Sequence, residues 1–227
     1  MTDEGGARRA QAFAQAYGQL RWGFLPGDPR AAAILASPEW AAQVDALAGP
    51  YARADPADLQ QLKSFAAAFE RPARFAEAYE VSFRGARLVS PFETDFTTTT
   101  AFEQANELAD IAGFYRAFNL GWQSATVDRV DHVAAEIEFL CAASWMEAKA
   151  RREGRPEEAA AASEAVSKFL ADHAGRWLDR FAANCQSRGV RPFFQACARA
   201  AAATVAEDMR LRGIEAKTIS PAALPMF

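Results

Sequence analysis

The amino-acid sequence predicts an all-α fold, organised as a single compact domain. Every long periodic segment has apolar residues three and four positions apart, which is the spacing of one face of a helix. Proline and glycine stand at most junctions between these segments, and we find no alternating strand pattern of useful length. We therefore expect roughly nine helices in one domain spanning residues 1–227, with a loose tail from about residue 214.

Composition and charge exclude several classes of protein. With 51% apolar residues in 227, the chain can build a substantial core. It carries 25 lysines and arginines against 29 acidic residues, a net charge of −4, so it lacks the basic surface of a nucleic-acid binder. Its three cysteines (Cys141, Cys185, Cys197) form no C-x-x-C pair, which argues against a disulfide framework. No run of eighteen apolar residues is present, so we expect a cytoplasmic protein without a membrane span.

Five helices are expected before residue 85. The first, residues 7–21, has apolar residues at helical spacing and ends near Gly23. Serine or aspartate followed by proline, a typical N-cap and first-turn pair, begins the next three at Asp28, Ser37 and Asp55. The expected ranges of the later four are 28–35, 37–47, 55–69 and 73–84.

A long irregular segment separates these helices from the second half. Residues 85–100 contain Ser90-Pro91-Phe92-Glu93 and four consecutive threonines, and long loops in compact domains are often functional. Helical spacing then resumes. The helices expected after the loop are residues 101–118, 131–149, 157–181 and 192–212.

The helix that opens with Asp131 and His132 is the expected centre of the fold. We expect Asp131 to cap it, because a short carboxylate accepts hydrogen bonds from the free backbone N–H groups of a first turn. Helical spacing places Glu138 on the same face as Asp131. An opposite apolar stripe should contain Val133, Ile137, Leu140, Ser144 and Ala148. The opening turn then faces a cleft, or else Asp131 is only a cap and His132 an ordinary interior histidine.

Enzymatic and metal-binding motifs are not found. The chain has neither a P-loop nor a dinucleotide-binding glycine fingerprint. Adjacent helical residues diverge by about 100°, so Asp131 is badly placed to orient His132 as a base, and no nucleophile motif accompanies them. Two histidines without H-x-x-x-H spacing make a poor metal ligand set. We therefore expect no catalytic activity, metal or cofactor. A small enzyme or metal protein using Asp131, His132 and Glu136, and a generic interaction module, remain as alternatives.

A binding function fits the residue pattern better. Aromatic residues cluster in sequence around the loop and the central helix, and Glu93, Asp95, Asp131 and Glu138 supply negative charge among them. Most of these aromatics should belong to the core. An apolar groove edged by carboxylates would nevertheless suit a short peptide that carries arginines and an apolar run.

Four segments, in order and spacing, resemble the TorD/DmsD/NarJ family of molybdoenzyme maturation chaperones, over roughly residues 75–210. The D-H-x-x-x-E-x-E-F segment from Asp131 to Phe139 is the most specific of them. One position departs from the pattern, because Arg129 stands where the family commonly has proline. The four segments are Tyr79-x-x-x-Phe83-x-Gly85, Ser90-Pro91-Phe92-Glu93, Asp110 to Phe118, and Asp131 to Phe139.

The resemblance implies an all-helical, non-catalytic cytoplasmic chaperone. Such a protein binds the apo catalytic subunit of a molybdopterin-dependent oxidoreductase, often through its twin-arginine leader, until the cofactor is inserted. We expect no nucleic-acid or membrane partner, and a monomer or homodimer. The peptide-binding residues that the resemblance implies are Asp131, His132, Pro91 and Phe92, together with Glu93 and Glu136.

Overall fold

The computed structural model describes residues 3–26, 28, 30–69, 72–85, 87–120 and 129–218. Its regular elements are helical, which confirms the all-α class. They are α1 (Glu4–Leu20), η1 (Arg21–Phe24), α2 (Ala31–Leu35), α3 (Pro38–Ala46), α4 (Pro56–Lys63), α5 (Phe65–Ala68), α6 (Pro72–Tyr79), η2 (Glu80–Arg84), α7 (Thr94–Thr97), α8 (Ala101–Ala117), α9 (Val133–Arg152), α10 (Pro156–Phe169), η3 (Leu170–Ala174), α11 (Gly175–Ser187) and α12 (Pro192–Arg212).

Local sequence signals set many of the helix ends. The Ser37 hydroxyl accepts a hydrogen bond from the Trp40 backbone N–H at 3.1 Å, and Asp55 accepts from the N–H of Ala57 at 2.8 Å. Thr100 and Glu103 form a reciprocal capping box at the start of α8. The last helix, α12, ends at Gly213, whose φ of 68° lies in the left-handed region that favours glycine.

Several segments differ from the sequence-based expectation. The helix predicted from Asp55 to Phe69 is broken at Ser64, whose hydroxyl donates to the Gln61 carbonyl at 2.8 Å and so satisfies the end of α4. The loop at residues 85–100 contains the short helix α7. The helix predicted over residues 157–181 is interrupted by the π-helical turn η3, and a similar turn, η2, extends α6.

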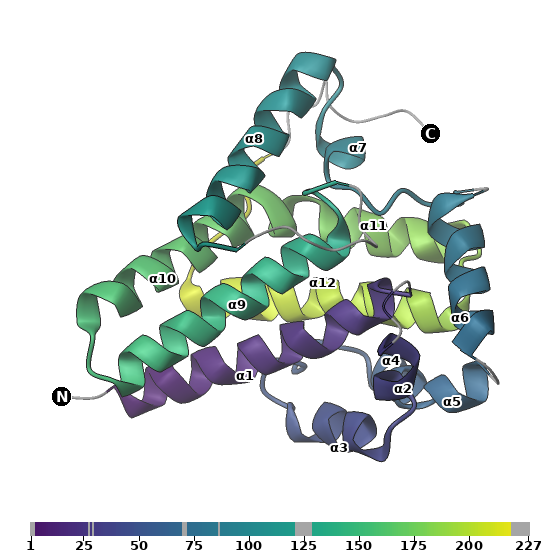
Figure 1. Ribbon diagram of the computed structural model, residues 1–227, viewed down its shortest axis with the longest axis horizontal. Helices are drawn as coiled ribbons and strands as arrows, with labels where there is room; N and C mark the ends of the chain where they lie inside the picture. The colour runs from purple at the N-terminus through teal and green to yellow at the C-terminus, as the bar shows by residue number, and fades with distance from the viewer. Residues whose placement is uncertain are drawn as a thin grey trace.

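The long helices pack around α9, as Figure 1 shows. The first helix, α1, runs along one side of α9, and α10 also packs against α9. The last helix, α12, packs against α1 and α11. Helices α2 to α5 form a group at one end, and α8 projects from the body (Figure 1). The predicted stripe on α9 is buried as expected: Val133, Ile137, Leu140, Ser144 and Ala148.

Aromatic side chains fill much of the core, including two clusters of contacting rings. In the first cluster, ring centroids lie between 5.0 and 6.1 Å apart. Most pairs in it meet edge to face, the favourable geometry for aromatic rings. The second cluster is centred on Phe139 and Phe169, whose centroids are 4.4 Å apart, with Phe114 and Phe118 against Phe139. The first cluster consists of Phe65, Phe69, Phe75, Phe193 and Phe194.

Residues 214–218 come after α12 and run to η3. The Lys217 N–H donates to the Ala171 carbonyl at 2.8 Å, and its side chain pairs with Asp172. The rest of the tail that we predicted to be loose lies outside the described residues. Within the described part of the chain, none of the helices combines the length and apolar character that a membrane crossing requires.

Candidate functional site

A short antiparallel bridge joins the loop before α7 to the start of α9. The Glu93 N–H donates to the Asp131 carbonyl, and the Val133 N–H donates to the Pro91 carbonyl, both at 2.9 Å. Phe92 and His132 are the bridged pair. The structure thus brings together four of the predicted site residues, although they lie about forty positions apart in sequence. We call Pro91, Phe92, Asp131 and His132 the bridge site.

The Asp131 side chain caps a different helix from the one expected. Its carboxylate accepts from the backbone N–H of Thr94, the first residue of α7, at 3.1 Å, and from the Thr94 hydroxyl at 2.8 Å. Arg129 donates to it through Nε at 3.0 Å and Nη2 at 2.7 Å. The prediction that Asp131 caps the central helix is wrong, because the chain enters α9 one residue later and turns the carboxylate toward α7.

His132 is the N-cap of α9. Its Nδ1 accepts from the Ala134 N–H at 3.1 Å, so the proton sits on Nε2, which lies 2.8 Å from the Tyr79 hydroxyl. Burial, with lesser contributions from Arg84 and Arg129, lowers the pKa of His132 to about 3. The imidazole is therefore neutral at physiological pH. It serves as both the cap of the central helix and a link to α6.

Phe92 is the member of the bridge site that reaches solvent. Its ring meets His132 edge to face, with centroids 5.4 Å apart, and the Arg129 guanidinium lies over it, 4.1 Å from the ring centroid. Asp131 is fully buried, and 29% of the Arg129 side chain is exposed. An approaching ligand would therefore meet Phe92 and Arg129 before it meets the carboxylate.

Beneath the bridge site lies a buried polar group of four residues, Glu93, Glu136, His173 and Trp177, which we call the inner cluster. The Trp177 indole N–H donates to Glu136 at 2.9 Å, and His173 Nδ1 lies 3.1 Å from Glu93. The carboxyl groups of Glu136 and Glu93 interact with each other. The predicted residues Glu93 and Glu136 thus support the loop from below and are not exposed.

Burial decides where the proton of this carboxyl pair resides. It raises the pKa of Glu136 well above the usual value, and the neighbouring Glu93 charge adds to the effect. Burial also raises the pKa of Glu93, but His173 opposes this rise. The pKa of His173 is raised by Glu93, Glu107 and Asp110, which outweigh its desolvation. Within the pair, Glu93 raises the pKa of Glu136 while Glu136 lowers that of Glu93, so the shared proton belongs on Glu136, and the contact with His173 favours the charged forms of Glu93 and His173.

A ligand set for a metal ion was the alternative that used His132 and Glu136. In the structure, His132 bonds Tyr79 while Glu136 bonds Trp177, so the two face different partners. Within the described residues, the group nearest to a metal ligand set is Glu93, Glu107 and His173, whose ligand atoms all lie within 4.8 Å of one another.

Positive charge is already present beside that group. Arg176 donates to Glu107 at 2.9 Å and lies 3.8 Å from Glu93, and a protonated His173 adds a second positive charge. The cluster is therefore balanced by the chain's own cations. An Asp-His catalytic pair has no support either, because Asp131 bonds Arg129 and Thr94 while His132 bonds Tyr79.

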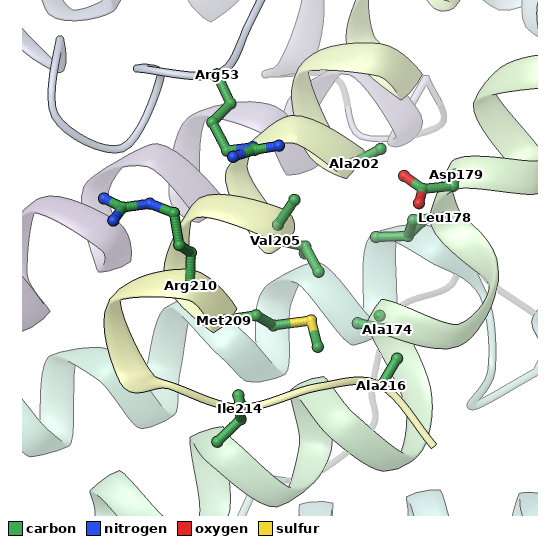
Figure 2. Close-up of a pocket in the computed structure, with 12 residues that line it drawn as sticks. Arg53, Ala174, Leu178, Asp179, Ala202, Val205, Met209, Arg210, Ile214 and Ala216 are labelled. Atoms are coloured by element: carbon green, nitrogen blue, oxygen red, sulfur yellow. The ribbon is translucent and has the colours of Figure 1, made fainter. Parts of the chain in front are cut away.

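A pocket of about 340 Å³ lies on the other side of η3 (Figure 2). Its walls come from η3, α11, α12 and residues 214–216. Figure 2 shows an apolar floor around Val205 and Met209, with Arg53 and Arg210 along one side and Asp179 on another. This pocket was not foreseen from the sequence, because its residues come from three stretches far apart in the chain: Arg53, residues 174–179 and residues 202–216.

Gly175, which lines this pocket, should not tolerate a side chain. A Cβ there would lie 2.5 Å from the Leu170 carbonyl oxygen and 2.6 Å from the Met209 sulfur. We expect Gly175→Ala to lower the free energy of unfolding by about 1 to 3 kcal/mol. Gly113→Ala, in open space on α8, should be neutral or stabilising by up to about 1 kcal/mol. Urea denaturation of both variants tests this, and equal stability would contradict the close approach at Gly175.

Sequence reasoning missed the roles of His173 and Arg129. His173 and Trp177 are four residues apart, which is the spacing of one helical face, so the sequence could have indicated that both side chains reach the same polar cluster. The η3 turn gives no comparable sequence signal. Arg129 was recognised only as a departure from the family pattern, and its pairing with Asp131 depends on how the chain enters α9.

A comparison with family models gives one finding that agrees with this geometry. The model of the family described as nitrate reductase delta subunit matches residues 50–183, more than half of the chain. The match includes the bridge site and the inner cluster. A search of curated proteins found no significant match. The chain therefore belongs to the nitrate reductase delta subunit family, within the TorD/DmsD/NarJ group, whose general role is the maturation of molybdoenzymes.

Proposed function

We propose that this protein is a cytoplasmic, non-catalytic chaperone for one molybdopterin-dependent oxidoreductase. It binds the apo catalytic subunit, including its twin-arginine leader, while the cofactor is inserted. The observation that carries the proposal is the family match over residues 50–183, which spans the bridge site. The separation of Asp131 from His132 also supports a binding role over a catalytic one.

The proposed leader site is the bridge site together with its support. Phe92 offers an aromatic face for the apolar part of the peptide, and Pro91 and His132 fix the backbone on either side of it. Asp131 supplies the carboxylate for an arginine. Glu93 and Glu136 act from beneath, since their hydrogen bonds to His173 and Trp177 hold the loop in place.

Phe92→Ala should weaken binding of the leader without unfolding the protein. The ring is half-exposed, so its removal leaves no closed cavity, and anchors of this kind contribute about 1 to 3 kcal/mol to a peptide interface. The measurement is calorimetric titration with a synthetic twin-arginine leader peptide of a molybdoenzyme catalytic subunit. Phe102→Ala is the matched control, because Phe102 is 76% exposed on α8 and outside the bridge site. Equal losses in the two variants would show that the leader binds elsewhere.

A further inference from the structure

The carboxylate proposed to receive a leader arginine already holds an arginine of this chain. Arg129 binds Asp131 through two nitrogens, Nε to one carboxylate oxygen and Nη2 to the other, which is the bidentate geometry that guanidinium and carboxylate groups prefer. The Thr94 N–H and hydroxyl complete the shell of donors around Asp131. Asp131 is fully buried, so a peptide cannot reach it past Arg129.

The Arg129 guanidinium also makes the contacts expected of a bound ligand group. It lies over the Phe92 ring at 4.1 Å, and its Nη1 lies 3.5 Å from Asp95. These groups define a slot shaped for a planar cation. Asp131 lies below the guanidinium, the Phe92 ring lies beside it and Asp95 lies at the edge. The side chain that fills the slot is 29% exposed, so solvent and a peptide can both reach it.

We propose that Arg129 occupies the leader's arginine slot in the unbound protein, and that a leader arginine binds by displacing it. This inference rests on the proposed function. The exchange replaces one guanidinium by another, so Asp131 never becomes an unpaired buried charge and the fold is kept. The leader can bind only those molecules in which Arg129 has left the slot. If the slot is open in about one molecule in ten, the apparent affinity for the leader is about tenfold weaker than that of a permanently open slot.

The same geometry makes the slot selective for arginine over lysine. A guanidinium presents a planar fork that matches both oxygens of Asp131 and stacks on Phe92, whereas an ammonium offers a single compact charge. Only an incoming arginine reproduces all the contacts that Arg129 gives up. A peptide that carries lysine in place of arginine therefore does not displace Arg129.

The first test examines the slot without any leader. Arg129→Ala should empty it, and ethylguanidinium at millimolar concentration should then raise the melting temperature of the variant more than propylammonium at equal ionic strength. The unsubstituted protein should respond equally to both ions, because its slot is filled. Arg129→Gln, which keeps a hydrogen-bonding side chain, provides a second folded variant. Equal responses of Arg129→Ala to the two ions would overturn the slot.

The second test uses leader peptides that carry an arginine pair or a lysine pair. Arg129→Ala should bind the arginine leader about tenfold more tightly than the parent does, with little gain for the lysine leader. Arg87→Ala is the control, because Arg87 pairs with Asp95 and not with Asp131. An unchanged affinity in Arg129→Ala would overturn the displacement. If neither protein binds the leader while ethylguanidinium still stabilises Arg129→Ala, the proposed function fails and the guanidinium slot stands.

Discussion

Glu93→Gln is expected to lower the free energy of unfolding by about 1 to 3 kcal/mol, the cost of losing a buried charged hydrogen-bond partner while Glu107 and Asp110 still face His173. Glu93 is fully buried, and its charge faces the protonated His173 at 3.1 Å. The substitution keeps the shape of the side chain but leaves His173 without that counter-charge. It should also loosen the loop before α7, because Glu93 connects this loop to η3. Guanidinium-induced unfolding followed by circular dichroism measures the change.

Glu136→Gln is the matched control for this prediction. Glu136 carries the shared proton, and a glutamine can still accept from the Trp177 indole and present an N–H in place of the carboxyl proton. We expect a change within about 1 kcal/mol, since the Trp177 indole keeps its acceptor and no charge is removed. If Glu136→Gln proves more destabilising than Glu93→Gln, the charge of the pair resides on Glu136 and our assignment is reversed.

His132 should make the protein sensitive to acid. Burial lowers its pKa to about 3 in the fold, against about 6.5 for a free imidazole, so the folded state takes up this proton at a lower pH than the unfolded state does. The stability that neutral His132 contributes is complete above pH 6.5 and is lost as pH falls toward 3. Between pH 6.5 and 4 the expected loss is about 3 kcal/mol. Protonation would also remove the Nδ1 acceptor that caps α9.

His132→Asn isolates this effect. The asparagine oxygen can replace Nδ1 as the N-cap acceptor, yet it does not titrate. The free energy of unfolding of the variant should therefore fall less between pH 6.5 and 4 than that of the parent, by about the same 3 kcal/mol. The raised pKa values of His173 and Glu136 act in the opposite direction, but they are common to both proteins. Parallel pH profiles for the two proteins would contradict a neutral, buried His132.

Much of the fold could be predicted because its signals are local. Proline at a first turn, serine or aspartate before it and the left-handed Gly213 mark helix ends through contacts within a few residues. The ends of α8 and α12 were predicted to within about one residue for this reason. The π-helical turns η2 and η3 were not, since a π-turn has no residue signature of its own and continues the helix before it.

The candidate site was only partly predictable, because its chemistry depends on contacts distant in sequence. The resemblance identified Phe92, Asp131 and His132, and the structure brings them together at the bridge. Their roles differ from those expected from helical spacing. Asp131 caps α7, and Arg129 covers its carboxylate. A helical-wheel argument could not reveal this, because it assumes that Asp131 belongs to α9.

Binding of the catalytic subunit in its apo and cofactor-loaded forms tests the central claim most directly. In a calorimetric titration of this protein with each form of the client molybdoenzyme subunit, we expect the apo subunit to bind. The loaded subunit should bind at least tenfold more weakly, because a chaperone that acts before cofactor insertion must release the finished enzyme. Equal affinity for both forms, or no binding to either, would contradict the account.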